Sequence, residues 1–249
     1  MSNDPVLLLH GQPGAASDWD HVRASIDGDA RTIAFDRPGW DRRSAVRDLA
    51  GNASAARTVL DRTGIERATV VGHSLGAAVA AWLAWSSPER VSRLVLVAPA
   101  ANVDSLSAVD YLLATPVVGW LAGVGAMAGG GLALGAGPAR RWVAEATALD
   151  DRYLQSAGRA LLTPSSWRSF IREQRLLVRD LPVLERRLDQ ISASTTIVAG
   201  TGDRVVPLAA ARRLAGQIRE AELVEIEHAG HLVHLHHAGE VARAIAGGG

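Results

Sequence analysis

The stretch VVGHSLGAAVAAWLAW, residues 70–85, places one serine between two glycines at the point where a strand meets a helix. The valines at its start are typical of a buried strand, and the alanine-rich remainder is typical of a helix that packs on a sheet. Ser74 lies at the turn between them, with Gly72 and Gly76 on either side. A strand that reverses directly into a helix crowds the positions beside the apex, so these positions need very small residues. We therefore expect a sharp turn that presents the Ser74 hydroxyl; an ordinary turn that happens to contain serine is the alternative.

Short apolar runs separated by helical stretches organise most of the chain. The runs are continuous rather than alternating, which is typical of parallel strands buried on both faces. The predicted strands are residues 5–9, 31–35, 67–72, 93–98, 195–200 and 222–226, and the predicted helices lie near 45–63, 75–86, 164–190, 208–218 and 238–246. This alternation predicts an α/β fold with a doubly wound sheet, in which active groups gather at the carboxyl ends of the strands.

The interval 99–194, between the fourth and fifth predicted strands, is far longer than one crossover helix requires. Its segment 111–139 contains no charged residue and is long enough to span a membrane. Pro116 and many glycines lower its helix propensity, and a span here would separate the first four strands from the last two. We expect residues 101–163 to form a helical lid, flanked by an α/β core of residues 1–100 and 164–249.

The composition excludes several classes of partner. The 26 basic and 26 acidic residues balance, and no basic stripe interleaved with aromatics is present, so we expect no nucleic-acid partner. The chain has no cysteine, which excludes disulfides and thiolate metal ligands. Its first residues lack the positive segment of a signal peptide. We expect a cytoplasmic protein without a metal or other cofactor; the oligomeric state stays open.

A serine hydroxyl needs a base to become a nucleophile, and histidine held by a carboxylate is the common solution. Asp203 follows the fifth predicted strand and His231 follows the sixth. The chain order Ser74, Asp203, His231 is the order found with a nucleophile elbow on this kind of sheet. Taken singly, the aspartate or the histidine could be an ordinary turn residue. Asp104, after the fourth strand, is the alternative carboxylate.

With these residues in place, the chain resembles an α/β-hydrolase-fold enzyme with a serine nucleophile. The segments that carry the resemblance are LLLHGQPG, FDRPGW, VVGHSLGA, LVLVAPA, AGTGDRVVP and EHAGHLVH, spread over residues 6–234. The resemblance implies catalytic roles for Ser74, Asp203 and His231. It also implies an oxyanion hole made by the backbone N–H groups of Gln12 and Leu75.

The sequence departs from the family pattern at its start and in the RPGWDRRS loop. Many members carry a β-hairpin before the strand that ends in His-Gly, and only four residues precede Pro5 here. We expect six parallel strands in the order 2-1-3-4-5-6, without that hairpin. The loop has Trp40 and Asp41 in place of a usual glycine, which we expect to reshape the entrance to the site.

Several other polar residues near these segments have structural interpretations. We expect His10, Asp36 and Arg37 to hold loop backbone, and His73 to support the elbow. A metal site is one interpretation of the remaining histidines, but no acidic partner lies at ligand spacing, and we expect a solvated helix start. These histidines are His228, His234, His236 and His237.

The leading functional interpretation is hydrolysis of an ester-like bond in a small apolar acyl or aromatic molecule. The same triad can cleave thioesters, lactones, amides or carbon–carbon bonds, or run lyase chemistry, because fold alone does not determine the reaction. Epoxide hydrolases and haloalkane dehalogenases share the HG-x-P loop but use aspartate where this chain has Ser74. A non-catalytic ligand receptor on a hydrolase scaffold is the alternative of another class; we expect no membrane partner.

Overall fold

The computed structural model describes residues 4–26, 30–147 and 149–247. Its centre is one parallel sheet of six strands in the order β2-β1-β3-β4-β5-β6, which confirms the predicted order. The strands are β1 (Val6–Leu9), β2 (Thr32–Ala34), β3 (Ala68–His73), β4 (Val91–Val97), β5 (Ser194–Gly200) and β6 (Glu222–Ile226).

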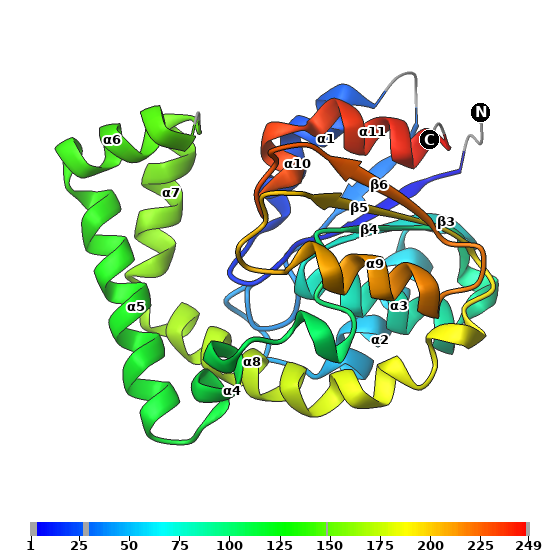
Figure 1. Cartoon of the computed structure of the whole chain (residues 1–249), viewed down its shortest axis with the longest axis horizontal. Coiled ribbons are helices and arrows are strands. Elements are labelled where there is room, and N and C mark those ends of the chain that lie inside the picture. The colour runs from blue at the N-terminus through cyan, green and yellow to red at the C-terminus, as the bar shows by residue number, and fades with distance from the viewer. Residues whose placement is uncertain (1–3, 27–29, 148, 248–249) are drawn as a thin grey trace.

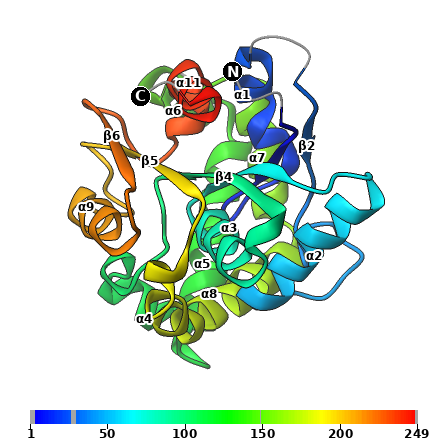
Figure 2. The same ribbon diagram turned by 90° about the vertical axis from the view of Figure 1, so that its right-hand side faces the viewer.

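Helices cover both faces of the sheet (Figures 1 and 2). One face carries α2 (Leu49–Arg62), α3 (Leu75–Ser86), α8 (Pro164–Glu185) and α9 (Leu208–Gln217). The other carries α1 (Asp20–Ser25), α10 (Val233–His236) and α11 (Ala238–Ala246). Short 3-10 turns occur at η1 (Ala16–Trp19), η2 (Pro88–Arg90), η3 (Val103–Ser105) and η4 (Leu188–Gln190). The layers are those of a doubly wound α/β fold.

The two faces explain why strand β1 is apolar at every position. In β1, Leu7 and Leu9 pack into the core beneath α3, whereas Val6 and Leu8 pack into the core on the opposite face. Successive side chains of a strand point to opposite faces, so a strand covered on both sides needs an apolar residue at each step.

The structure differs from the predicted elements at several boundaries. Strand β2 is two residues shorter than predicted, and α2 begins at Leu49 rather than near residue 45. Asp48 explains the later start, because its carboxylate accepts a hydrogen bond from the N–H of Gly51 and caps the helix. The short helices α1 and α10 were not predicted, since segments of this length have little periodicity.

Four helices fill the insertion between β4 and β5: α4 (Ala108–Ala114), α5 (Val118–Gly135), α6 (Gly137–Thr147) and α7 (Asp151–Leu161). They form an arm beside the core, with α5 and α7 side by side (Figure 1). The two helices approach closely at Gly131 and Gly158, where an added Cβ on Gly158 would lie 2.8 Å from Leu134. Before the arm begins, Asn102 donates a hydrogen bond to the carbonyl of Ala210, so this part of the chain lies on the core.

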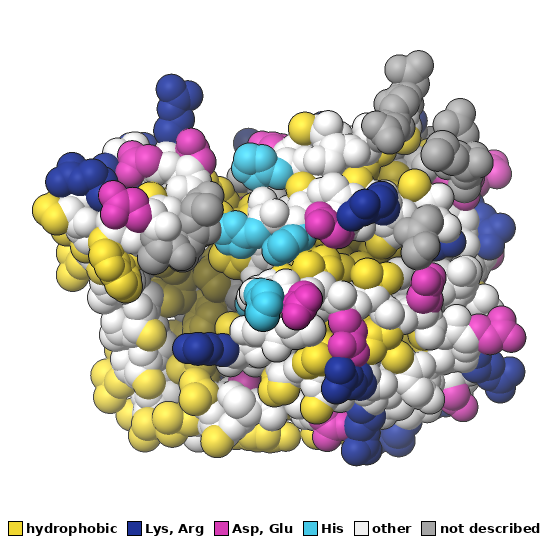
Figure 3. Space-filling view, turned by 45° about the horizontal axis from the view of Figure 1, so that its top comes forward, with side chains coloured by type: hydrophobic (Ala, Val, Ile, Leu, Met, Phe, Trp, Pro, Cys, Tyr) yellow, Lys and Arg dark blue, Asp and Glu magenta, His cyan; other side chains and the backbone are white. Residues whose placement is uncertain are grey.

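Much of the arm's apolar surface is exposed. The exposed large apolar side chains of α4, α5 and α6 and the segment between α4 and α5 are Val109, Tyr111, Leu112, Val117, Val118, Trp120, Leu121, Leu132 and Trp142. Figure 3 shows a hollow between arm and core with hydrophobic walls. Within the described residues, α5 is the one helix long and apolar enough, by length and composition alone, to cross a membrane.

Candidate active site

Ser74 occupies the sharp turn between β3 and α3 that its flanking glycines predict. Its backbone has φ 53° and ψ −120°, a conformation that residues with a side chain rarely adopt. A Cβ on Gly72 would lie 2.2 Å from the carbonyl oxygen of Gly76, and a Cβ on Gly76 would lie 2.3 Å from that of Leu9. A side chain fits at neither position unless the neighbouring backbone shifts, so this tight reversal of strand into helix favours glycine on both sides.

Asp203 and His231 meet at the carboxyl edge of the sheet. The Nδ1 atom of His231 lies 2.8 Å from Oδ2 of Asp203, and the Asp203 side chain is 2% exposed. The other carboxylate oxygen accepts hydrogen bonds from the N–H groups of Val205 and Val206. With its Nδ1–H donated to a carboxylate, His231 keeps Nε2 free to accept a proton.

The predicted alternative carboxylate, Asp104, is engaged elsewhere. It forms an ion pair of 2.7 Å with Arg213 on α9, and its side chain is 42% exposed. Asp203 is therefore the carboxylate that the structure places on His231.

Ser74 and His231 lie on adjoining loops that His73 links. The His73 ring donates from Nε2 to the backbone carbonyl of His231 across 3.0 Å, and the two imidazole centroids are 4.9 Å apart. The described residues include no hydrogen bond between Ser74 and His231. In unliganded active sites such hydrogen bonds are commonly long and tighten when substrate binds.

The backbone N–H groups of Gln12 and Leu75 have no hydrogen-bond partner within the described part of the chain. Leu75 begins α3, where the first N–H groups of a helix lack partners. Gln12 belongs to the loop after β1, and this loop approaches Ser74: a Cβ on Gly11 would lie 3.2 Å from Cβ of Ser74. Two free donors beside the serine are what an oxyanion hole requires.

Sequence comparisons agree with this geometry. The profile of the family described as "Alpha/beta hydrolase family" matches residues 6–244. The chain belongs to this family. The α/β-hydrolase fold that the sequence resemblance implied is thus confirmed, as is its sheet of six parallel strands.

Two curated relatives of this α/β hydrolase align over nearly its whole length. One is a 2-hydroxy-6-oxononadienedioate/2-hydroxy-6-oxononatrienedioate hydrolase of Pseudomonas putida, 26% identical, with 97% of this chain and 86% of the relative covered. The other is a 2-hydroxy-6-oxo-6-phenylhexa-2,4-dienoate hydrolase of Comamonas testosteroni, 28% identical, with 96% and 85% covered.

Solved structures share the fold. An alpha/beta hydrolase fold protein from Burkholderia ambifaria has a TM-score of 0.78 at 24% identity, with 98% of this chain and 90% of that chain covered. A meta-cleavage product hydrolase from Pseudomonas fluorescens IP01 has a TM-score of 0.75 at 24% identity, with 98% and 89% covered.

A stack of buried histidines lies behind His231 in this α/β hydrolase. The centroids of the His73 and His234 rings are 4.0 Å apart, and those of the Trp19 and His234 rings are 5.1 Å apart. Burial lowers the pKa of His73 well below its usual value and lowers the pKa of His234 to about 3; repulsion from neighbouring histidines adds to both shifts. Both rings are therefore neutral at physiological pH, so neither places a fixed cation beside His231.

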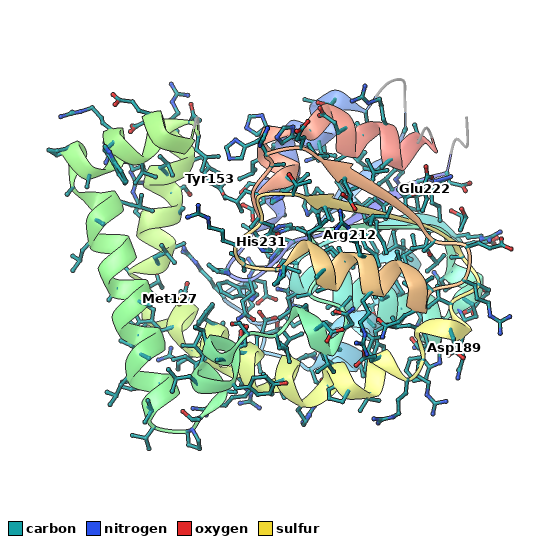
Figure 4. All side chains as sticks on the ribbon, viewed as in Figure 1. Met127, Tyr153, Asp189, Arg212, Glu222 and His231 are labelled. Carbon is teal, nitrogen blue, oxygen red and sulfur yellow. The ribbon has the colours of Figure 1, made fainter. Side chains whose placement is uncertain are left out.

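His234 corrects one expectation from the sequence. It was expected at a solvated helix start, but it is 1% exposed because α10 places it against Trp19 and His73. His228 and His236 are exposed, as that expectation required. Figure 3 shows histidines on the core beside the hollow, and Figure 4 shows His231 on the side of the core that faces α7.

His10, Asp36 and Arg37 hold loop backbone, as expected. Nε2 of His10 accepts the N–H of Arg37, and a carboxylate oxygen of Asp36 accepts the N–H of Ala16. The sequence did not indicate that Arg37 is completely buried, nor that Glu173 on α8 pairs with it. No local pattern could reveal this pair, because its members are 136 positions apart.

The arm also reaches the core through a polar contact of Tyr153. Tyr153 extends from α7 toward the core (Figure 4), and its hydroxyl interacts with the carboxylate of Asp18 in η1. Burial raises the pKa of Asp18 to about 6, an effect that a hydrogen bond from the N–H of Ala15 partly offsets. The same burial and the nearby Asp18 carboxylate raise the pKa of Tyr153, so its hydroxyl stays protonated and can donate.

Proposed function

We propose that this α/β hydrolase cleaves a bond next to a carbonyl group of a small molecule through an acyl-enzyme on Ser74. The observation that carries the proposal is the hydrogen bond between Asp203 Oδ2 and His231 Nδ1, formed beside a serine held at positive φ. A binding protein has no need of a serine in this conformation or of an oriented base beside it. The non-catalytic receptor is therefore the weaker alternative.

In the proposed mechanism, Nε2 of His231 takes the Ser74 proton as the oxygen attacks the carbonyl carbon. Asp203 holds the histidine tautomer and stabilises the imidazolium, which returns the proton to the leaving group. The N–H groups of Gln12 and Leu75 stabilise the oxyanion, a contribution typically worth about 3–4 kcal/mol for one donor. Water, activated by the same histidine, then releases the acyl group from Ser74.

For the bond that is cleaved, we propose the carbon–carbon bond beside the 6-oxo group of a 2-hydroxy-6-oxo acid. The support is the near full-length similarity to two hydrolases named for such substrates. In this reaction Ser74 keeps the acyl part, and the carbon leaving group receives its proton from His231. The substrate is thus an aromatic-derived keto acid rather than an ester.

Ester hydrolysis, the leading expectation from the sequence, is the second candidate. The apolar arm favours it, because α5 has no polar side chain other than the indole of Trp120. Such a wall suits an acyl chain or an aromatic ring better than a charged acid. We also propose that α4 to α7 act as the lid of the site, excluding water from the hollow seen in Figure 3.

A paired assay tests the reaction. The purified chain is first treated with a fluorophosphonate probe, which we expect to label wild type and not Ser74→Ala. It is then given 2-hydroxy-6-oxo-6-phenylhexa-2,4-dienoate and, separately, p-nitrophenyl esters of increasing chain length. Turnover of the keto acid with a kcat/KM at least tenfold above the best ester supports carbon–carbon cleavage. The reverse ranking selects the ester, and absence of labelling refutes the nucleophile.

A further inference from the structure

Helix α8 carries two consecutive buried polar residues, Glu173 and Gln174, which are 2% and 4% exposed. Burying a carboxylate and an amide is costly unless both are fully paired. Glu173 pairs with Arg37 and Trp40 in the loop after β2, and Gln174 pairs with Gln12 in the loop after β1. The mechanism above uses neither residue, and neither belongs to a sequence motif.

Glu173 holds Arg37 inside the protein. Its carboxylate pairs with both terminal nitrogens of the guanidinium and also accepts a hydrogen bond of 2.8 Å from the indole of Trp40. Arg37 in turn donates from Nε to the carbonyl of His10 and from Nη2 to the carbonyl of Gly11, at 2.9 and 2.8 Å. The carboxylate thereby holds the guanidinium on two successive peptide groups.

The second of these peptide groups contains the proposed oxyanion donor. The carbonyl of Gly11 and the N–H of Gln12 belong to one planar trans peptide unit, so they point in opposite directions. A hydrogen bond that fixes the carbonyl therefore fixes the direction of the N–H. A cationic donor on the carbonyl also polarises the unit and strengthens its N–H as a donor.

Gln174 fixes the same residue from its side chain. Nε2 of Gln12 donates to Oε1 of Gln174 across 3.0 Å, and Nε2 of Gln174 donates to Asp110 on α4 across 2.9 Å. Because a carboxylate can only accept, Asp110 sets the direction of the whole series. With the hydrogen bonds in this direction, Oε1 of Gln12 is buried without a partner among the described residues. Docking of α4 is thus linked to the orientation of Gln12.

We propose that Arg37, held by Glu173, is a positioning residue that orients and polarises the Gly11–Gln12 peptide group for oxyanion stabilisation, and that Gln174 and Asp110 link this group to the arm. The inference rests on the proposed function, because it assigns a role to the same site. If Arg37 has this role, loss of the Arg37–Glu173 pair lowers kcat and the rate of phosphonate labelling, with little change in KM.

The test separates this role from a purely structural one. Arg37→Met or Glu173→Met alone leaves a buried charge unpaired and should lower the urea concentration at the midpoint of unfolding. The double variant removes both charges, so its midpoint should return close to that of wild type. We expect the double variant to keep a kcat and a labelling rate about 10- to 100-fold below wild type, with KM within about threefold, because a donor displaced by about 1 Å loses this much.

The chain offers a matched control in Arg90, which donates to the carbonyls of Glu66 and Ile65 and pairs with Asp61 far from the site. The double variant Arg90→Met/Asp61→Met should leave kcat within twofold of wild type. If the Arg37→Met/Glu173→Met protein does not fold, Gln174→Met decides instead, with an expected loss of kcat of about tenfold.

The outcomes are distinct. Recovery of kcat together with stability in the double variant, or an unchanged kcat in Gln174→Met where that variant decides, overturns the positioning role and leaves the proposed function intact. A wild type that is neither labelled nor active overturns the proposed function and this inference with it. A raised KM at unchanged kcat assigns the pair to substrate binding and also overturns the inference.

Discussion

Replacing Gly76 with alanine should disable the site without unfolding the protein. The new Cβ would lie 2.3 Å from the carbonyl oxygen of Leu9 and 2.5 Å from that of His10, both backbone atoms. Ordinary contact requires roughly 3.5 Å, so the loop after β1 and helix α3 must separate by about 1 Å. That loop carries the proposed oxyanion donor of Gln12, and α3 begins beside Ser74.

Two effects on stability oppose each other in Gly76→Ala. Alanine favours a helix over glycine by up to about 1 kcal/mol, whereas overpacking a close contact costs typically about 1–3 kcal/mol. We expect the steric cost to prevail, with a net loss of about 1–2 kcal/mol in the free energy of unfolding. The activity should suffer more, because a displacement of about 1 Å in a catalytic group can lower the rate about 100-fold.

The measurements are urea unfolding and the rate of fluorophosphonate labelling. Gly216→Ala on α9 is the matched control, because a Cβ there meets no atom within 4 Å. It should leave labelling unchanged and raise stability by up to about 1 kcal/mol. A Gly76→Ala protein that is more stable than wild type and labels within twofold of it would refute the steric reasoning.

Three further predictions concern the carboxylate, the buried acid and the arm. Asp203→Asn should lower kcat about 10⁴-fold by favouring the wrong histidine tautomer, whereas Asp104→Asn should keep kcat within twofold of wild type. The opposite ranking in the esterase or keto-acid assay contradicts the assignment of Asp203. The pKa of Asp18 is raised on folding, so the native chain binds more protons than the unfolded chain between about pH 4 and 6. The free energy of unfolding therefore falls as the pH rises through that window, by up to about 3 kcal/mol. Asp18→Asn should flatten this slope in urea unfolding at pH 4.5 and 6.5, and equal slopes in the two proteins count against it. Gly123→Trp should change the preferred acyl length while Ser74 still reacts with a small phosphonate, because a Cβ at position 123 already lies 3.0 Å from an α8 side chain. Ala126 is exposed, so Ala126→Trp should change the preferred acyl length less. Altered sedimentation or vesicle partitioning with an unchanged acyl-length profile contradicts a lid.

Local sequence determined the sheet and the elbow. The apolar runs predicted every strand to within two residues at each end, since parallel strands covered on both faces are largely apolar. The crowding that requires glycine beside Ser74 is likewise a property of adjacent residues, so it could be inferred before any coordinates. Asp203 and His231 could be paired from the sequence because parallel strands end at one edge of the sheet.

Tertiary structure alone decided which polar residues are buried and what they contact. Arg37 and Glu173 meet only because α8 returns from the arm and packs beneath the loop after β2. His234 looks like its exposed neighbours in the sequence, yet α10 places it against Trp19 and His73, where burial keeps its ring neutral. Sequence periodicity indicates which side of an element faces the core. The pairing of distant polar groups depends instead on how the elements pack, which neighbouring residues along the chain do not determine.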